Sequence, residues 1–375
     1  RDLYHGKGAL EALKSFTGKK AMICVGGGSM KRFGFLDRAE QYLKEAGMEV
    51  QLFEGIEPDP SVETVMKGAK AMMEFEPDWI IAMGGGSPID AAKAMWIKYE
   101  YPDITFEDMC KVFGIPALRK KAHFCAISST SGTATEVTAF SIITDYEKGI
   151  KYPIADFEIT PDVAIVDPEL VEGLPVKQVA YTGMDALTHA IEAYVSTLHC
   201  PYTDPLALQA IEMVLTYLPA SYNKNMEARE QMHYAQCLAG MAFSNAGLGI
   251  IHAMAHALGG RFGLPHGLCN AILLPYGMEF NGTDKITSRE FKKIAAALAL
   301  PGADSMTGFQ ASTASAAYLR EFSALLGLPQ RLRDMEVNPE IFDELAETAM
   351  EDSCMDDNPF KPTKEQVEDV YRRAY

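Results

Sequence analysis

Residues 79–93 read WIIAMGGGSPIDAAK, and they predict a strand, a glycine turn and a helix in direct succession. The apolar run 79–83 has the length of a buried strand. Ser87 is a natural N-cap, Pro88 suits the first helical position, and Asp90 completes a pattern like a capping box. A glycine turn that leads into a helix N-terminus readily binds an anion, so we expect pyrophosphate there. A plain strand-to-helix turn is the alternative.

The same arrangement recurs near the start of the chain, where residues 21–29 read AMICVGGGS. Further strands are predicted at 50–53, 124–127 and 163–166, and helices at 36–46 and 61–74. Strands that alternate with helices predict a parallel sheet covered on both faces. From about residue 174, long stretches rich in Ala, Leu, Met and Glu replace this alternation. We therefore predict an α/β dinucleotide-binding domain over 1–173 and an all-α domain over 174–375.

A third polar stretch, 128–136, reads SSTSGTATE and follows another predicted strand. Hydroxyl groups at the carboxyl end of a strand can line a ribose or phosphate site, and Ser128, Thr130 and Thr133 are candidates for this role. A solvated loop is the alternative. Neither GGGS turn matches GxGxxG, so the common dinucleotide fingerprint is absent.

Four of the eight histidines fall into two small groups in the predicted helical domain. Asp185 and His189 are four residues apart, as are His252 and His256, and each pair shares one helix face. His266 follows in a short loop. In apolar surroundings these groups need partners, and one buried divalent metal would satisfy several together. A carboxylate with imidazoles and no thiolate suits Fe(II) or Zn(II). For any single histidine, a hydrogen-bonded core residue is the alternative.

One uncharged stretch and one acidic stretch are interpreted as structural rather than functional. Residues 231–260 contain no Asp, Glu, Lys or Arg, but their histidines and glycines disfavour a membrane span. They predict a buried helix pair that is broken near Gly247 and Gly249. The acidic run 344–357 predicts a solvated helix face.

Composition and charge argue against a protein that binds nucleic acid or membranes. The 375 residues include 34 Lys and Arg against 51 Asp and Glu, which gives a net charge of −17. Such a surface repels phosphate backbones and anionic membranes, so we expect neither nucleic acid nor membrane as a partner. The seven cysteines include no CxxC and indicate a reducing compartment. The first residues carry charge rather than an apolar run, and we expect a cytoplasmic protein.

The sequence resembles the iron-containing (group III) alcohol dehydrogenases, and within them the butanol-dehydrogenase-like, NADPH-using aldehyde reductases. The matching motifs are GGGSPIDAAK at 84–93, SSTSGTATE at 128–136, GMDALTHAIEAY at 183–194, HAMAHALGG at 252–260 and PHG at 265–267. The resemblance implies the two-domain architecture of that family, with an all-α metal-binding domain similar to that of dehydroquinate synthase. It implies the metal ligands Asp185, His189, His252 and His266. It also implies that His256 is a catalytic proton acceptor outside the ligand set.

The resemblance further implies which residues contact the cofactor. Gly85, Gly86 and Ser87 match the pyrophosphate contacts, and Asp90, Thr130, Thr133 and Lys151 match positions around the nicotinamide and its ribose. A carboxylate beside the adenosine ribose favours NAD, but no acid follows the first strand before Asp37. Gly27, Gly28 and Ser29 can receive a 2′-phosphate, and Lys31 and Arg32 add positive charge nearby. We therefore expect NADP(H) in preference to NAD(H).

These features predict reversible hydride transfer between a nicotinamide cofactor and a primary alcohol or aldehyde, by a homodimer. The metal is expected to act as a Lewis acid on the substrate oxygen. One alternative is a glycerol-dehydrogenase-like polyol dehydrogenase, or a dehydroquinate-synthase-like zinc enzyme, on the same plan. The Asp and three His together argue against it. A non-catalytic metal-binding scaffold is the other alternative, and the intact cofactor loops argue against that.

Overall fold

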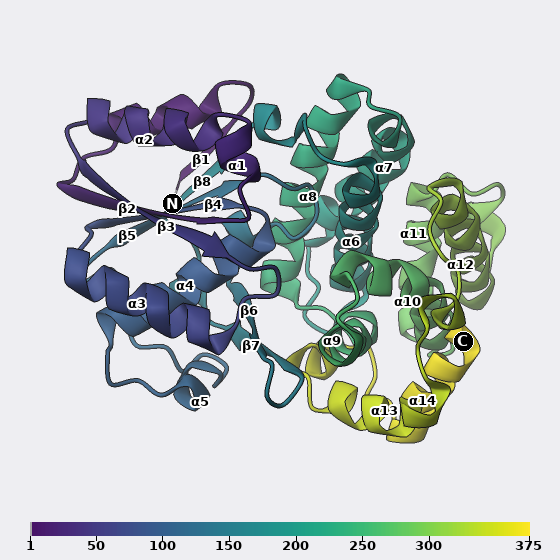
Figure 1. The fold of residues 1–375 in the computed structure, drawn as a ribbon. Helices are drawn as coiled ribbons and strands as arrows, with labels where there is room; N and C mark the ends of the chain where they lie inside the picture. Colours follow the sequence, from purple (N-terminus) through teal and green to yellow (C-terminus); the bar gives the residue numbers. More distant parts are fainter. Residues whose placement is uncertain (1) are drawn as a thin grey trace. The chain divides into compact units, whose positions relative to one another are not determined.

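The computed structural model describes residues 2–375, and the chain divides into two compact units. Unit 1 is Arg1–Leu174 and contains every strand of the described chain. Unit 2 is Pro175–Tyr375 and is helical throughout. Figure 1 shows the change from strands and helices to helices alone along the sequence. The predicted fold class, a parallel α/β domain followed by an all-α domain, is confirmed.

Unit 1 is built on a six-stranded sheet with the order β1-β8-β5-β4-β2-β3, in which every pair is parallel. The strands are β1 (Asp2–His5), β2 (Lys20–Gly26), β3 (Glu49–Ile56), β4 (Trp79–Gly84), β5 (His123–Ser128) and β8 (Val163–Val166). The helices are α1 (Ser29–Arg32), α2 (Phe35–Glu45), α3 (Val62–Phe75), α4 (Gly86–Glu100) and α5 (Phe106–Met109). A separate antiparallel hairpin, β6 (Phe140–Asp145) and β7 (Ile150–Ala155), was not expected from the sequence.

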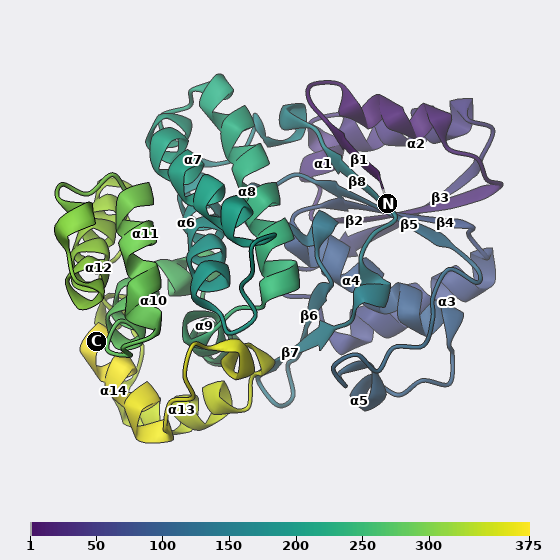
Figure 2. The ribbon, with the colours of Figure 1, turned by 180° about the vertical axis from the view of Figure 1, so that it is seen from behind.

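Alternate side chains along the central strands enter two different cores. Ile80 and Ala82 of β4 pack with α3 and α4, whereas Ile81 and Met83 pack with α2. This alternation follows from the two-residue period of a strand. Figures 1 and 2 show α1 and α2 on one face of the sheet and α3 and α4 on the other. The continuous apolar runs of the central strands therefore reflect burial on both faces.

The predicted start of α4 is wrong by two residues. Gly85 is the N-cap, and no side chain caps this helix. The Ser87 hydroxyl instead accepts a hydrogen bond from the backbone N–H of Asp59, at 3.2 Å. The chain turns at Gly84, whose φ of 144° favours glycine, and so it enters the helix before Ser87 is reached. The first helical turn therefore leaves its N–H groups without a side-chain cap.

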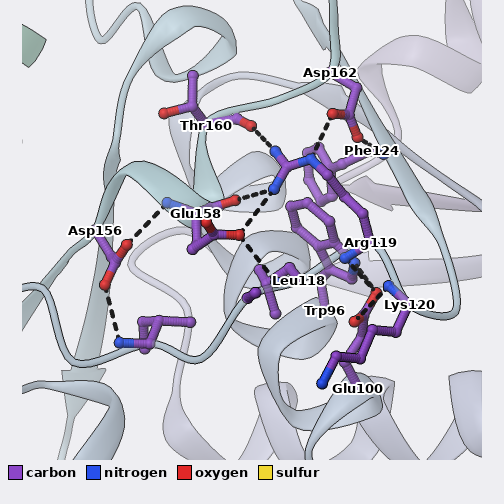
Figure 3. Close-up of polar contacts among 12 residues, drawn as sticks. Trp96, Glu100, Leu118, Arg119, Lys120, Phe124, Asp156, Glu158, Thr160 and Asp162 are labelled. Carbon is purple, nitrogen blue, oxygen red and sulfur yellow. Dashed lines mark hydrogen bonds and ion pairs between the residues drawn. The ribbon is translucent and has the colours of Figure 1, made fainter.

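Arg119 ties together the loops at the amino ends of β5 and β8 (Figure 3). Its guanidinium donates to Asp162 Oδ1 at 2.6 Å and to the backbone oxygens of Glu158 and Thr160 at 2.8 and 2.7 Å. It also lies 4.9 Å from the centre of the Trp96 ring. Only 18% of its side chain is exposed, so these contacts are poorly screened by solvent.

We expect Arg119→Met to lower the free energy of unfolding of unit 1 by about 3 kcal/mol, because it leaves buried acceptors and a carboxylate without their cation. Urea unfolding followed by tryptophan fluorescence measures this, since both tryptophans lie in unit 1. Lys111→Met is the control. It removes an exposed pair with Asp108 and is expected to leave the free energy of unfolding nearly unchanged. Equal effects of the two variants would contradict a structural role for the Arg119 contacts.

The helices of unit 2 are α6 (Val176–Val195), α7 (Asp204–Tyr222), α8 (Met226–Ala246), α9 (Ile250–Phe262), α10 (His266–Asn281), α11 (Glu290–Ala297), α12 (Gly308–Leu325), α13 (Phe342–Met350) and α14 (Lys364–Ala374). The predicted break lies between α8 and α9, where Gly247 has a φ of 74° and the axes bend by 104°. Taken alone, none of the described helices has the length and apolar character to cross a membrane, although α8 and α9 reach that threshold together.

Candidate metal centre and cofactor loops

Three helices of unit 2 bring the four predicted metal ligands together. Asp185 and His189 lie on α6, His252 on α9, and His266 begins α10. One potential ligand atom from each lies within 4.8 Å of all the others. Asp185 Oδ1 is 3.7 Å from His252 Nε2 and 3.4 Å from His266 Nε2. Residues 81 positions apart in the sequence thus converge on one point.

The donor atoms of this cluster suit a cation. The amide nitrogen of Asn270 lies 2.7 Å from Asp185 Oδ1, and 3.0 and 3.1 Å from the Nε2 atoms of His252 and His266. These three acceptors therefore direct their lone pairs at a single electropositive group. Although burial opposes the charge, the three neighbouring histidines hold the pKa of Asp185 well below its usual range. A buried carboxylate with convergent imidazoles fits Fe(II) or Zn(II).

His256 lies beside this cluster but outside it. Its ring stacks on that of His266, with centroids 5.1 Å apart and planes inclined by 16°. Its Nδ1 is 2.8 Å from Asp352 Oδ2. Asp352 belongs to the acidic run predicted to be a solvated helix face, and for this residue the prediction is wrong because only 6% of its side chain is exposed. Asp352 lies two residues after the end of α13 and caps the short 3-10 helix Ser353–Asp357.

Sequence reasoning missed three residues of the site. Glu192 lies seven positions after Asp185 on the same face of α6, and Asn270 lies four after His266, so helical spacing would have located both. Asp352 carried no such signal, because its partner is 96 positions away. Of the remaining histidines, His199 pairs with Asp204 at 3.1 Å, and burial lowers the pKa of His233 to about 3. Both lie outside the metal cluster.

The three predicted cofactor loops start at the carboxyl ends of adjacent strands. Val25 pairs with Met83, and Gly84 pairs with Ser128, so the turns after β2, β4 and β5 lie side by side. The sheet reverses its order here, because β3 lies to one side of β2 and β4 to the other. Ligands of open parallel sheets bind at such reversal points.

Two of these loops pack closely against each other at Gly85 and Gly86. A Cβ on Gly85 would lie 3.0 Å from the methyl group of Thr130, and a Cβ on Gly86 would lie 2.9 Å from that of Thr133. The Thr130 hydroxyl is buried and has no hydrogen-bond partner within residues 2–375. Ser128 donates to the backbone oxygen of Thr130 at 3.0 Å. The loops therefore offer close backbone approach and an unsatisfied hydroxyl, as a bound nucleotide requires.

Two charged residues adjoin these loops. Lys151 of β7 forms an ion pair with Asp59 at 2.6 Å, and the backbone of Asp59 donates to Ser87. Asp90 lies one turn into α4, near Lys93. Burial raises the pKa of Asp90 and lowers that of Lys93, whose ammonium donates to the backbone oxygens of Thr138 and Phe140 at 2.7 and 2.9 Å.

The first glycine turn differs from the second. Gly28 has a φ of 85°, and Ser29 begins the short helix α1. A Cβ on Gly27 would meet no atom within 4 Å, so this position is open. The Nζ of Lys31 lies 3.2 Å from Glu54 of β3. The sequence did not predict that this acid lies beside the turn. Gly27, Gly28 and Ser29 thus stand at the end of β2 with charges of both signs nearby.

Comparison with known proteins covers the whole chain. Residues 1–168 match the family described as iron-containing alcohol dehydrogenase, and residues 179–375 match the C-terminal region of the Fe-containing alcohol dehydrogenase family. The chain is 57% identical over 379 residues to the NADPH-dependent butanol dehydrogenase of Clostridium saccharobutylicum, covering 100% of this chain and 96% of that protein.

Two further relatives differ in length. The aldehyde-alcohol dehydrogenase of Streptococcus pneumoniae is 41% identical over 399 residues, which cover 99% of this chain but 45% of that protein. The solved structure of an iron-containing alcohol dehydrogenase from Thermococcus thioreducens is 37% identical, with a TM-score of 0.90 and coverage of 100% of this chain and 97% of that one. The similarity to the solved structure extends through both units.

Proposed function

Because the chain belongs to the iron-containing alcohol dehydrogenase family and is a metal-dependent alcohol dehydrogenase or aldehyde reductase, we propose which of its residues perform each task. Asp185, His189, His252 and His266 hold one divalent metal, with Fe(II) as the resident ion and Zn(II) as a substitute. The convergence of their donor atoms within 4.8 Å carries this assignment. When bound, the metal supplies a Lewis acid for the substrate oxygen and the nicotinamide supplies or accepts the hydride.

The residues of unit 1 bind and orient the cofactor in this proposal. The N–H groups of Gly85, Gly86 and Ser87 receive the pyrophosphate, because they begin α4 at the point where the sheet reverses its order. The remaining contacts, to the nicotinamide and its ribose, are assigned to Ser128, Thr130, Thr133, Asp90 and Lys151. The unpartnered hydroxyl of Thr130 supports this assignment.

His256 moves the proton. Its Nδ1 is engaged by Asp352, so Nε2 is the atom that takes up a proton during alcohol oxidation and returns it during aldehyde reduction. The ring stacks on His266, a proposed ligand, and this contact keeps it beside the reacting groups.

The substrate is proposed to be a short unbranched primary alcohol or its aldehyde, since the Clostridium relative is named for butanol. The test is loss of reduced-nicotinamide absorbance with a panel of aldehydes that starts at butanal, using NADPH and NADH separately. Metal analysis is done on the same freshly purified preparation. Turnover without any bound divalent metal, or no turnover of any aldehyde, would contradict the proposal.

We propose NADP(H) as the preferred cofactor, on the sequence argument and because the same relative is NADPH-dependent. Gly27, Gly28 and Ser29 would receive the 2′-phosphate at the end of β2. Lys31 forms an ion pair with Glu54, which reduces its attraction for the 2′-phosphate. The backbone N–H groups and Arg32 therefore contribute the larger part of the attraction for that phosphate. Equal or better catalytic efficiency with NADH would contradict this preference.

Gly27→Asp is expected to raise the KM for NADPH by about tenfold or more, while the KM for NADH changes much less. The added carboxylate repels the 2′-phosphate but can accept a hydrogen bond from the ribose 2′-hydroxyl of NADH. Gly27 has open space around it, so the new side chain fits. Steady-state kinetics with both cofactors measures the change. Gly27→Asn, which has the same size without the charge, is the control and is expected to raise both values alike.

The oligomeric state and the location are two further proposals. We propose a homodimer, and we propose a cytoplasmic location because seven free cysteines are typical of a reducing compartment. Light scattering coupled to size-exclusion chromatography, and fractionation of the source cells, test the two separately.

A further inference from the structure

The two histidines of α9 differ in their carboxylate partners. His252 and His256 are one helical turn apart, and each presents Nδ1 to a buried acid from another part of unit 2. Glu192 of α6 lies 2.5 Å from Nδ1 of His252, and Asp352 lies 2.8 Å from Nδ1 of His256. The exposed fractions of the two acid side chains are 1% and 6%. Neither acid belongs to the cluster of four predicted metal ligands.

The carboxylate of Glu192, a residue of α6, is hydrogen-bonded to the backbone at the start of α9. Its Oε1 accepts the backbone N–H of Ile251 at 2.8 Å, and its Oε2 accepts that of His252 at 3.2 Å. The carboxylate therefore engages two of the N–H groups at this helix N-terminus in addition to the imidazole ring. With Nδ1 as the hydrogen-bond donor, the lone pair of His252 lies on Nε2, which faces Asp185 and the Asn270 amide. A carboxylate on the far nitrogen orients a ligand histidine and raises its basicity.

Asp352 holds His256 in the tautomer that His252 also adopts, with the proton on Nδ1, but outside the metal cluster. Its second oxygen accepts the backbone N–H of Cys354 at 2.8 Å, so its orientation is fixed as well. Burial raises the pKa of the Cys354 thiol well above its usual value. With Nδ1 engaged by Asp352, Nε2 is the nitrogen of His256 that remains for exchange of a proton.

We propose that these acids divide the α9 histidines between two tasks: Glu192 positions His252 for the metal, and Asp352 positions His256 for proton transfer. Both acids are positioning residues, and the inference rests on the proposed function. Spacing alone cannot separate two histidines on one helix face. The acid that accepts from Nδ1 distinguishes the two histidines. The partner of His252 is Glu192, which stands on the same helix as the proposed ligands Asp185 and His189.

The test compares Glu192→Gln with Asp352→Asn, each serving as the control for the other. On metal-free protein, competition with a chromophoric chelator for Zn²⁺ is expected to show about 10- to 100-fold weaker binding for Glu192→Gln. The affinity of Asp352→Asn for Zn²⁺ is expected to match that of the wild type. In the Fe(II)-loaded enzyme, Asp352→Asn is expected to lower kcat by at least about tenfold with little change in KM.

A double-mutant cycle separates positioning from general stability. If Asp352 acts through His256, adding Asp352→Asn to His256→Ala causes no further loss of kcat. Should Glu192→Gln fail to fold by circular dichroism, Glu192→Asp keeps the charge and is expected to retain intermediate Zn²⁺ affinity. Equal Zn²⁺ affinities for both acid variants, or additive losses in the cycle, would overturn the inference. A wild-type chain that binds no divalent metal would overturn the proposed function as well.

Discussion

Replacing His252 by alanine is expected to reduce the metal content from one ion per chain to a trace and to lower alcohol oxidation and aldehyde reduction to background. The reason is geometric. His252 Nε2 is one of the four donor atoms within 4.8 Å of one another, so alanine at this position leaves the metal with three of its four protein ligands. Its loss also removes one of the three hydrogen-bond donors to the buried Glu192 carboxylate.

Metal analysis of protein purified without added metal, together with NADPH-coupled assays, measures both effects. His199→Ala is the matched control, because His199 also pairs with an acid, Asp204, but lies outside the cluster. It is expected to keep both metal and activity. Circular dichroism checks that the helices of each variant survive. Full metal occupancy with normal turnover in the His252 variant would show that the ligand assignment is wrong.

Much of the fold was predictable because its signals are local. Fifteen consecutive residues, 79–93, predict a strand, a glycine turn and a helix. The similar pattern at 21–29 predicts the neighbouring strand. The helical pairs were predictable for the same reason, since four residues span one turn. The separate hairpin of β6 and β7 has no comparable pattern and was missed.

The parts that were not predictable depend on distant contacts. Helical spacing places Glu192 on the face of α6 that carries Asp185, but its partner could not be predicted, because His252 lies sixty positions later on α9. Asp352 stands in an acidic run whose composition indicates solvent exposure, and only the chain path after α13 buries it. Glu54 illustrates the same limit in unit 1, because it meets Lys31 through the pairing of β2 with β3.

His256→Ala is expected to retain the metal and to lower kcat by roughly 100- to 10,000-fold, the usual contribution of a positioned acid or base. The residue sits one turn beyond His252 and stacks on His266, but its donor atom is not among the four that converge. The variant therefore separates proton transfer from metal binding. A changed pH profile of alcohol oxidation is expected along with the slower turnover, since the group that takes up the proton is gone.

The alanine variant also opens a space beside His266, so a second variant is needed to separate packing from proton transfer. His256→Gln fills most of that space and can still donate to Asp352, but it cannot exchange a proton at neutral pH. We expect it to be nearly as slow as the alanine variant while holding its metal fully. If the glutamine variant were as fast as the wild type, His256 would act through packing alone. If either variant lost its metal, His256 would be a ligand, and the division of the two histidines of α9 would have to be abandoned.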